Sequence, residues 1–420
     1  MTALTDAYRE MFAIGDFSKL DAEMNKIQLE YEKGQWTDTE LWNLFDTPFA
    51  ADDPAFEDLY NKWVAAYPQS YAAHYARGAY YLRLVTKYTA DSKHAAEAKR
   101  AVTASLQDHT ASLTLTAIPL LTYCMLIDLY TISGDRGKIR AIYDGAIKLD
   151  PQGVVVRARY MVALNKAGTA AEMQALVADM RKTGRDEGDI RVAIANLHVR
   201  LFSESRYADL DSELNGIQKS YEAGKISDET LDDYFSNFYT TNAAAERGLD
   251  AWIRAYPKSY AARQGRCTYF LATASVARGT KFVKDTSAKE LAGMELYLSR
   301  AAADCRAAAP LTKKPILSYK NLIQIAQMGG GRDTRKQMLD FANIVDPKNS
   351  VVRVQYMFGL QTKWGGSLQQ MQDFLAQAKL AGVSEQGIEQ LYNLILEELI
   401  CDVCNGTENF AKIGTVVTGF

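Results

Sequence analysis

Apolar residues recur three and four positions apart along almost the whole chain, and the breaks between these runs carry Gly, Pro or a residue that can cap a helix. This periodicity is typical of amphipathic α-helices. Leu20, Met24, Ile27 and Tyr31 form one such stripe, which ends near Gly34, a residue suited to the left-handed backbone beyond a helix end. Strand-like alternation is nearly absent, so the pattern predicts an all-α protein.

Much of this pattern occurs twice. Residues 66–73 return almost unchanged as residues 255–262, and an Asp-Pro pair at 150–151 returns at 346–347. Self-similarity over such a distance indicates a stacked helical-repeat architecture, in which each repeat packs on its neighbours. We therefore expect two duplicated halves in tandem.

The residues before each Asp-Pro pair have the spacing of the tetratricopeptide repeat (TPR), in which two antiparallel helices pack large side chains against small ones. The match is partial, because Ala326 in the second half aligns with the larger Tyr130. The predicted fold class is therefore an all-α, TPR-like helical-repeat solenoid. The matching positions are Leu126, Tyr143 and Ala146 in the first half, and Leu322, Leu339 and Ala342 in the second.

The repetition also sets the expected domain boundaries. The first half, the more diverged copy, covers residues 1–204, and the second covers 205–382. Residues 383–420 are predicted to form a capping helix and a tail, because the last repeat of a solenoid needs one apolar and one solvated side. Within the tail, residues 415–417 are compatible with a short strand or with irregular chain.

The second half resembles a bacterial family classed as domain of unknown function 4034, which has TPR-like helices. The resemblance covers roughly residues 207–382 and implies no known reaction. The first half departs from it at residues 89–92, so the resemblance places any activity tied to this region in the second half. The segments that carry the resemblance are 256–260, 277–282, 315–319, 346–347 and 360–367.

Composition narrows the class of protein. The 420 residues are 48% hydrophobic and 24% charged, which is typical of a globular protein, and the net charge of −3 lacks the basic excess of a nucleic-acid binder. Residues 1–10 mix acids and bases where a secretory signal is apolar, and no apolar run has transmembrane length. We expect a cytoplasmic protein with neither a nucleic-acid nor a membrane partner.

Five cysteines are too few and too scattered for a disulfide framework, which agrees with a reducing cytoplasm. Cys124, Cys267 and Cys305 lie in apolar helical patterns and are interpreted as core residues. Cys401 and Cys404 have metal or redox spacing, but zinc would need two further ligands and a thioredoxin-type pair opens a helix after a strand. We interpret these two thiols as structural or incidental.

Catalytic motifs are missing from the sequence. The Gly run at 329–331 lacks the Lys-Ser/Thr ending of a phosphate loop and is interpreted as a turn. No Gly-x-Ser-x-Gly or His-Glu-x-x-His occurs. We therefore predict no catalytic residue, no cofactor and no metal, while an enzyme that uses carboxylates in a cleft between the two halves remains an alternative.

Two groups of residues are candidates for partner binding. Arg278, Lys281 and Lys284 recur every three residues, which on a helix would place them along one edge, although Gly279 and Thr280 are equally compatible with a loop. This basic group is either a solvated edge or a docking patch for an acidic partner segment.

The second group joins tyrosine and arginine. An Arg follows each repeated Tyr at the same distance, close to a further aromatic residue, and this setting suits a guanidinium stacked inside the fold or one that binds a ligand. The residues are Tyr71 with Arg77 in the first half and Tyr260 with Arg266 in the second.

The predicted function is non-catalytic binding of another protein or peptide on a concave surface rich in Tyr and Arg. A narrower hypothesis is an adaptor, or an immunity protein that neutralises a toxin by covering its active surface. Residues 385–408 hold six acids and no Lys or Arg, which would suit a basic toxin such as a nuclease.

Overall fold

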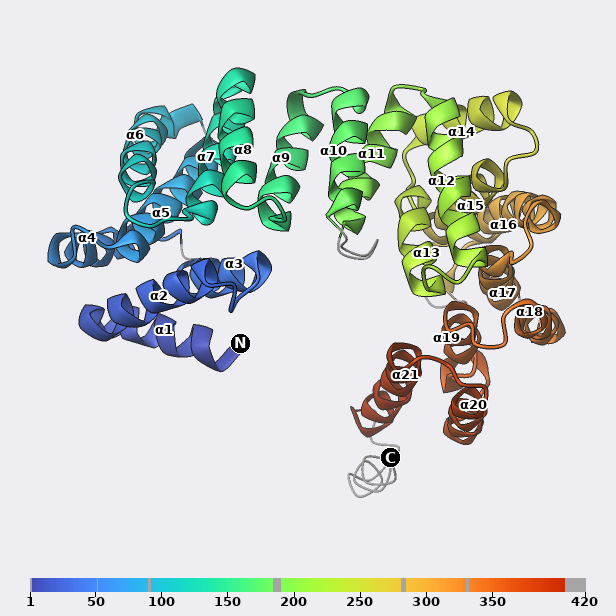
Figure 1. The fold of residues 1–420 in the computed structure, drawn as a ribbon. Coiled ribbons are helices and arrows are strands. Elements are labelled where there is room, and N and C mark those ends of the chain that lie inside the picture. The colour runs from blue at the N-terminus through green and yellow to red at the C-terminus, as the bar shows by residue number, and fades with distance from the viewer. Residues whose placement is uncertain are drawn as a thin grey trace. The chain divides into compact units, whose positions relative to one another are not determined.

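The computed structural model describes residues 2–50, 52–89, 92–183, 190–280, 285–329 and 332–404. Within these ranges the regular structure is helical throughout and no strand occurs, which confirms the predicted all-α class (Figure 1). The chain divides into two compact units, Met1–Leu197 (unit 1) and His198–Phe420 (unit 2). The predicted tail, residues 405–420, lies outside the described residues.

The helices are numbered along the chain. Unit 1 contains α1 (Thr2–Ile14), α2 (Phe17–Glu32), α3 (Asp38–Asp46), α4 (Glu57–Ala66), α5 (Tyr71–Thr89), α6 (Ala95–Ser112), α7 (Leu120–Ser133), α8 (Arg136–Leu149), α9 (Val154–Ala167) and α10 (Ala170–Lys182). Helix α11 (Arg191–Ser203) crosses the unit boundary. Unit 2 continues with α12 (Tyr207–Glu222), α13 (Asp228–Phe235), α14 (Ala243–Ala255), α15 (Tyr260–Arg278), α16 (Ala288–Ala308), α17 (Ile316–Met328), α18 (Arg332–Val345), α19 (Val351–Phe358), α20 (Leu368–Leu380) and α21 (Glu385–Cys404).

Consecutive helices pack as pairs within each unit, α5 on α6 and α7 on α8 in unit 1, and α15 on α16 and α17 on α18 in unit 2. Large and small residues at the predicted repeat positions are buried in both units. Tyr143 and the small Ala146 are buried in unit 1, and Leu339 and Ala342 are buried in unit 2. Pairing of this kind explains how the described helices cover their apolar stripes.

Capping residues mark the ends of corresponding helices in both units, including the predicted end at Gly34. Thr37 and Glu40 form the capping box that begins α3, and the side chain of Ser227 accepts a hydrogen bond from Thr230 N to begin α13. Gly34 and Gly224 have φ values of 75° and 69°, in the left-handed region that favours glycine. Local chemistry therefore fixes where α2 and α12 end and where the following helices begin.

The two units also share their long-range hydrogen bonds. Tyr31 Oη donates to Asp150 Oδ2 over 2.7 Å, and at the equivalent positions Tyr221 Oη donates to Asp346 Oδ2 over 2.6 Å. Each of these aspartates belongs to a repeated Asp-Pro pair. The bonds tie α2 and α12 to chain more than a hundred residues away, so the repeated sequence landmarks make repeated contacts.

The boundary between the units falls at 197/198 rather than at the expected 204/205. The last part of α11 belongs with unit 2, because the ring of His198 packs on Tyr234 and that of Phe202 packs on Phe238. The predicted capping helix is also part of unit 2, where α21 packs on α19 and α20. Its expected apolar face is buried at Leu391, Ile395 and Leu399.

The cysteines require a correction. Cys124, Cys267 and Cys305 are buried as predicted, but Cys267 of α15 and Cys305 of α16 form a disulfide. Disulfides persist mainly in oxidising compartments, so this bond removes the support that cysteine usage lent to a reducing cytoplasm. In unit 1 the equivalent positions hold Gly78 and His109, and the His109 ring fills the space beside Gly78.

Removing the disulfide by the paired substitutions Cys267→Ala and Cys305→Ala should lower the free energy of unfolding of unit 2 by about 2–4 kcal/mol. The bond closes a loop of 38 residues and so restricts the unfolded chain. Hydrogen exchange of the full chain, followed by mass spectrometry, should show faster exchange in α15 and α16 and unchanged exchange in α5 and α6. Added reductant should reproduce the effect in the native chain and do nothing to the variant. Equal exchange in oxidised, reduced and substituted chains would contradict the prediction.

Candidate functional site: a charged pocket in unit 1

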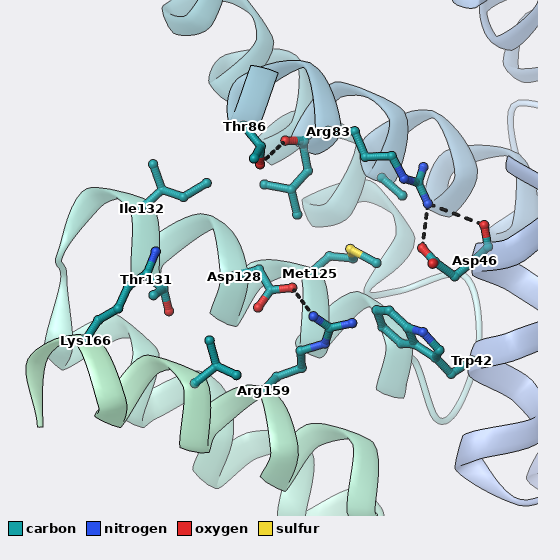
Figure 2. A pocket seen from close by; sticks show the side chains of 13 residues that line it. Trp42, Asp46, Arg83, Thr86, Met125, Asp128, Thr131, Ile132, Arg159 and Lys166 are labelled. Atoms are coloured by element: carbon teal, nitrogen blue, oxygen red, sulfur yellow. Dashed lines mark hydrogen bonds and ion pairs between the residues drawn. The ribbon is translucent and has the colours of Figure 1, made fainter. Parts of the chain in front are cut away.

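A pocket of about 300 Å³ opens between four helices of unit 1 (Figure 2). Helices α3, α5, α7 and α9 each supply part of its wall, although they are far apart in the sequence. Ala79, Leu82 and Met125 make an apolar floor of buried side chains. The remaining lining residues are Trp42, Asp46, Arg83, Thr86, Asp128, Thr131, Ile132, Arg159, Val162 and Lys166.

One buried carboxylate sets the position of α3 against α9. Asp38, at the start of α3, accepts hydrogen bonds at Oδ2 from Val154 N and, over 2.7 Å, from Val155 N. These amides begin α9, where the free N–H groups and the helix dipole favour a negative charge. The contact places Trp42, one turn further along α3, against Arg159, which lies one turn into α9.

Two arginine–aspartate pairs cross the pocket. Arg159 lies 3.3 Å from Asp128, and its guanidinium is 4.1 Å from the centroid of the Trp42 ring (Figure 2). Arg83 lies 2.5 Å from Asp46 and also donates to the carbonyl of Phe49 over 2.7 Å. Arg83 therefore holds the chain after α3 in place, whereas Arg159 presents a cation on an aromatic face inside the pocket.

Burial raises the pKa of Asp128 to about 6. The neighbouring charges of Arg159 and Lys166 oppose this shift, and the carboxylate of Asp46 adds to it. At neutral pH the ionised form of Asp128 therefore carries the free-energy cost of removing its charge from water. The lining holds three cations and two carboxylates on an apolar floor, which suits a ligand that has an acidic group beside an apolar part.

The equivalent place in unit 2 has different chemistry. Gln355 stands at the position of Arg159 and donates to Gln327 over 3.3 Å. Asp232, at the position of Trp42, is paired with Lys320 at 2.6 Å. The arginine on an indole face is therefore specific to unit 1. The other charged lining residues Arg83, Asp128 and Lys166 have Ala272, Gln324 and Thr362 as their unit 2 counterparts.

The predicted tyrosine and arginine residues lie elsewhere. Tyr71 and Tyr260 are core residues, each with 2% of its surface exposed, so the structure does not place them on a binding surface. Arg77 binds Asp108 through two hydrogen bonds of 2.8 and 2.7 Å. Burial opposes the ionisation of Asp108, but hydrogen bonds from His74 and Arg77 outweigh it and hold the pKa of this carboxyl below its usual value.

Arg266 repeats this arrangement in unit 2, where it binds Asp304 at 2.7 and 2.8 Å and Asp250 at 2.7 Å. The sequence suggested a guanidinium that is stacked inside the fold or one that binds a ligand. For this guanidinium, the structure supports a role within the fold. Its main partners are carboxylates rather than the expected aromatic ring, since Arg266 is 5.8 Å from the centroid of Phe270. The two arginines join α5 to α6 and α15 to α16.

The sequence offered two interpretations of the basic group, a helix edge or a loop, and no continuous helix runs through it. Helix α15 ends at Arg278, because Gly279 has a φ of 71° that stops the helix. Arg278 is half-buried and donates to the carbonyl of Gly279 over 3.2 Å. Lys281 and Lys284 lie outside the described residues.

The charged pocket was not predicted, although a signal for it is present in the sequence. Aligning the sequences of the two units shows that Asp128 and Arg159 of unit 1 both correspond to glutamine in unit 2. Such paired changes indicate positions that do not serve the shared fold. Within the described ranges, no group of three or more His, Cys, Asp or Glu side chains is arranged to hold a metal ion, and no helix is long and apolar enough to cross a bilayer.

Comparison with known proteins found no family model and no curated protein that matches the chain. The resemblance of the second half to the uncharacterised bacterial family therefore stays a prediction.

Replacing Asp128 by Asn should raise the free energy of unfolding at pH 7.5 by roughly 1–3 kcal/mol. The pKa of about 6 in the folded state exceeds the ordinary value of 3.8. The folded state therefore binds the proton more tightly, and stability falls as the pH rises from about 4 to about 6. The variant should lose this dependence and match the native chain near pH 4.

Chemical denaturation at pH 4, 6 and 7.5 measures this effect. Asp144→Asn is the control, because Asp144 forms an exposed ion pair with Arg140 and should change stability by less than about 0.5 kcal/mol. If Asp128→Asn is instead less stable at pH 7.5, the attraction to Arg159 outweighs the cost of burying the charge.

Proposed function

We propose that the chain is a non-catalytic, protein-binding helical-repeat protein whose charged pocket in unit 1 receives an acidic segment of a partner. The observation that carries this proposal is Arg159, a cation supported by the Trp42 ring and reached through a pocket with exposed apolar walls. Ile132 and Val162 form these walls, with 39% and 44% of their surfaces exposed. An acidic side chain or a chain terminus next to an apolar residue would meet both kinds of surface.

The proposal includes a TPR-like architecture that arose by duplication. The pairing of consecutive helices supports the first part, and the matched hydrogen bonds of Tyr31 and Tyr221 support the second. Helices that are already stacked lose little freedom when a partner binds, so more of the contact energy remains for affinity. Membership of the resembled bacterial family belongs to this same proposal.

The lining of the pocket favours binding over nucleophilic chemistry. It contains no Ser, Cys or His. Its two hydroxyl groups donate to carbonyls of their own helices, Thr86 to Leu82 over 3.3 Å and Thr131 to Ile127 over 2.6 Å. Neither threonine is therefore directed at a base that could activate it.

A narrower form of the proposal is an adaptor, or an immunity protein that covers the active surface of a toxin. Exposed Glu385, Glu389 and Glu397 on α21 offer negative charge to a basic partner. Glu398 does not contribute to this surface, because it is buried and accepts a hydrogen bond from Thr362 N over 2.7 Å.

An enzyme is the second candidate, and one observation favours it. A carboxyl group with a pKa near 6 can give and take a proton at neutral pH, and perturbed groups of this kind gather at active sites. Asp128 would then be the general acid or base. The substitution Asp128→Asn distinguishes the two candidates. An enzyme would lose turnover, whereas a binding protein would still bind its ligand.

Selection of phage-displayed random peptides on the native chain should enrich sequences that combine Asp or Glu with an apolar residue. Arg159→Gln, which introduces the unit 2 residue, should weaken the selected peptides at least about tenfold. Arg140→Gln is the matched control, because Arg140 is an exposed arginine of unit 1 outside the pocket. Fluorescence titration with labelled peptide measures the affinities.

The same titration can be carried out at pH 7.5 and at pH 6. Affinity for an acidic peptide should increase as the pH falls from 7.5 to 6, because protonation of Asp128 removes a carboxylate that repels the ligand. Asp128→Asn should bind as tightly as the native chain at pH 6 and show no such dependence. Selection without acidic enrichment, or equal binding by the two arginine variants, would rule out this role for the pocket.

A further inference from the structure

A second pocket, of about 620 Å³, lies inside unit 2 between α11, α12, α14 and the turn that follows α13. Its apolar wall is made by Val199, Phe202, Tyr207 and Phe238. This volume lies in the range of pockets that hold small organic molecules.

At the equivalent place in unit 1, aromatic side chains pack closely together. The Phe12 ring, which corresponds to Phe202, lies 6.4 Å from the ring of Phe56 and 4.5 Å from that of Tyr60. Only 4% of Phe12 is exposed, whereas Phe202 is half-buried.

The sequence alignment shows how the space in unit 2 arises. Its register is fixed by Trp63 and Trp252, whose indole N–H groups donate to Asp21 and Asp211 over 2.9 and 3.1 Å. In this register Phe56, Leu59 and Tyr60 of unit 1 are replaced by the smaller Ala245, Gly248 and Leu249. A Cβ atom at Gly248 would come within 2.6 Å of the Phe202 ring, so the glycine lets α14 approach this wall.

The charge at the rim is reversed between the units. Arg247 is exposed and lines the pocket, whereas Asp58 stands at this position in unit 1 and is paired with Lys62 at 2.6 Å. The pocket lining contains no carboxylate. Ser205 also lies at the rim, on the left-handed backbone that ends α11, where unit 1 has Gly15 after α1.

We propose that this pocket binds a small amphipathic organic anion, a molecule with an aliphatic or aryl body and one carboxylate. The body lies against Phe202, Tyr207 and Phe238, and the carboxylate faces Arg247. The apolar wall accounts for the first part and the exposed Arg247 for the second, since a neutral apolar ligand would need no cation and a cationic ligand would be repelled.

Isothermal titration calorimetry of the full chain with decanoate and with 4-phenylbutyrate tests the proposal. At least one of the two should bind the native chain with a stoichiometry of one. Ala245→Phe restores the unit 1 aromatic residue and should weaken this binding at least tenfold. Ala243→Phe is the matched control, because it adds the same side chain two residues earlier on α14 at an exposed position outside the lining, and it should leave binding unchanged.

A charge test uses Arg247→Gln, which should weaken the carboxylate about tenfold while binding of the neutral analogue of the same body, decanol or 4-phenylbutanol, stays within twofold. Circular dichroism of each variant checks that the fold is retained. The proposal is overturned if neither carboxylate binds the native chain, if Ala245→Phe binds as well as Ala243→Phe, or if Arg247→Gln affects acid and alcohol alike. Arg159→Gln in unit 1 should have no effect on any of these titrations.

Discussion

A single type of contact holds each unit together over a long stretch of chain: a buried aspartate at the start of a short helix accepts the first amides of a helix far along the sequence. Asp38 binds the amides that begin α9, and Asp228 binds Ser350 N and Val351 N at the start of α19 over 2.6 and 2.8 Å. The carboxylate leaves water, but it gains charge-assisted hydrogen bonds and a favourable helix dipole. Without this contact α3 would have no fixed register on α9, and the pocket between them would lose its shape.

The two units share this contact but differ in the side chains at two other places. Unit 1 carries ionised groups between α3 and α9, and its aromatic cluster around Phe12 is closed. Unit 2 has amides and the Asp232–Lys320 ion pair at the first place and an open apolar pocket at the second. The two units thus differ in chemistry at both places. The frame of backbone amides and buried carboxylates is common to both units, although Arg83, which holds the chain after α3 in unit 1, is replaced by Ala272 in unit 2.

Local features of the fold could be predicted from the sequence because their causes are local. The end of α2 at the left-handed Gly34 depends on residues a few positions apart and occurs as expected, and the capping box of Thr37 has an equally local origin. The pairing of Arg159 with Asp128 depends on how α7 and α9 lie against each other, which periodicity alone does not give. Aligning the sequences of the two units could have supplied part of the answer, since it marks the positions where charge differs while the helix pattern is the same.

The Gly78–His109 and Cys267–Cys305 pairs carry a consequence for how such a protein can be recombined. A cysteine at position 78 would place its Cβ 2.7 Å from the His109 ring, so α15 could not replace α5 while α6 stayed in place. The opposite exchange would leave Cys305 facing a glycine, with its sulfur unpaired and a gap beside it. Because each of these residues fits only its own partner, the two helices of a pair can be exchanged only together. Chimaeras of the two units, in the laboratory or in evolution, must therefore exchange whole helical hairpins rather than single helices.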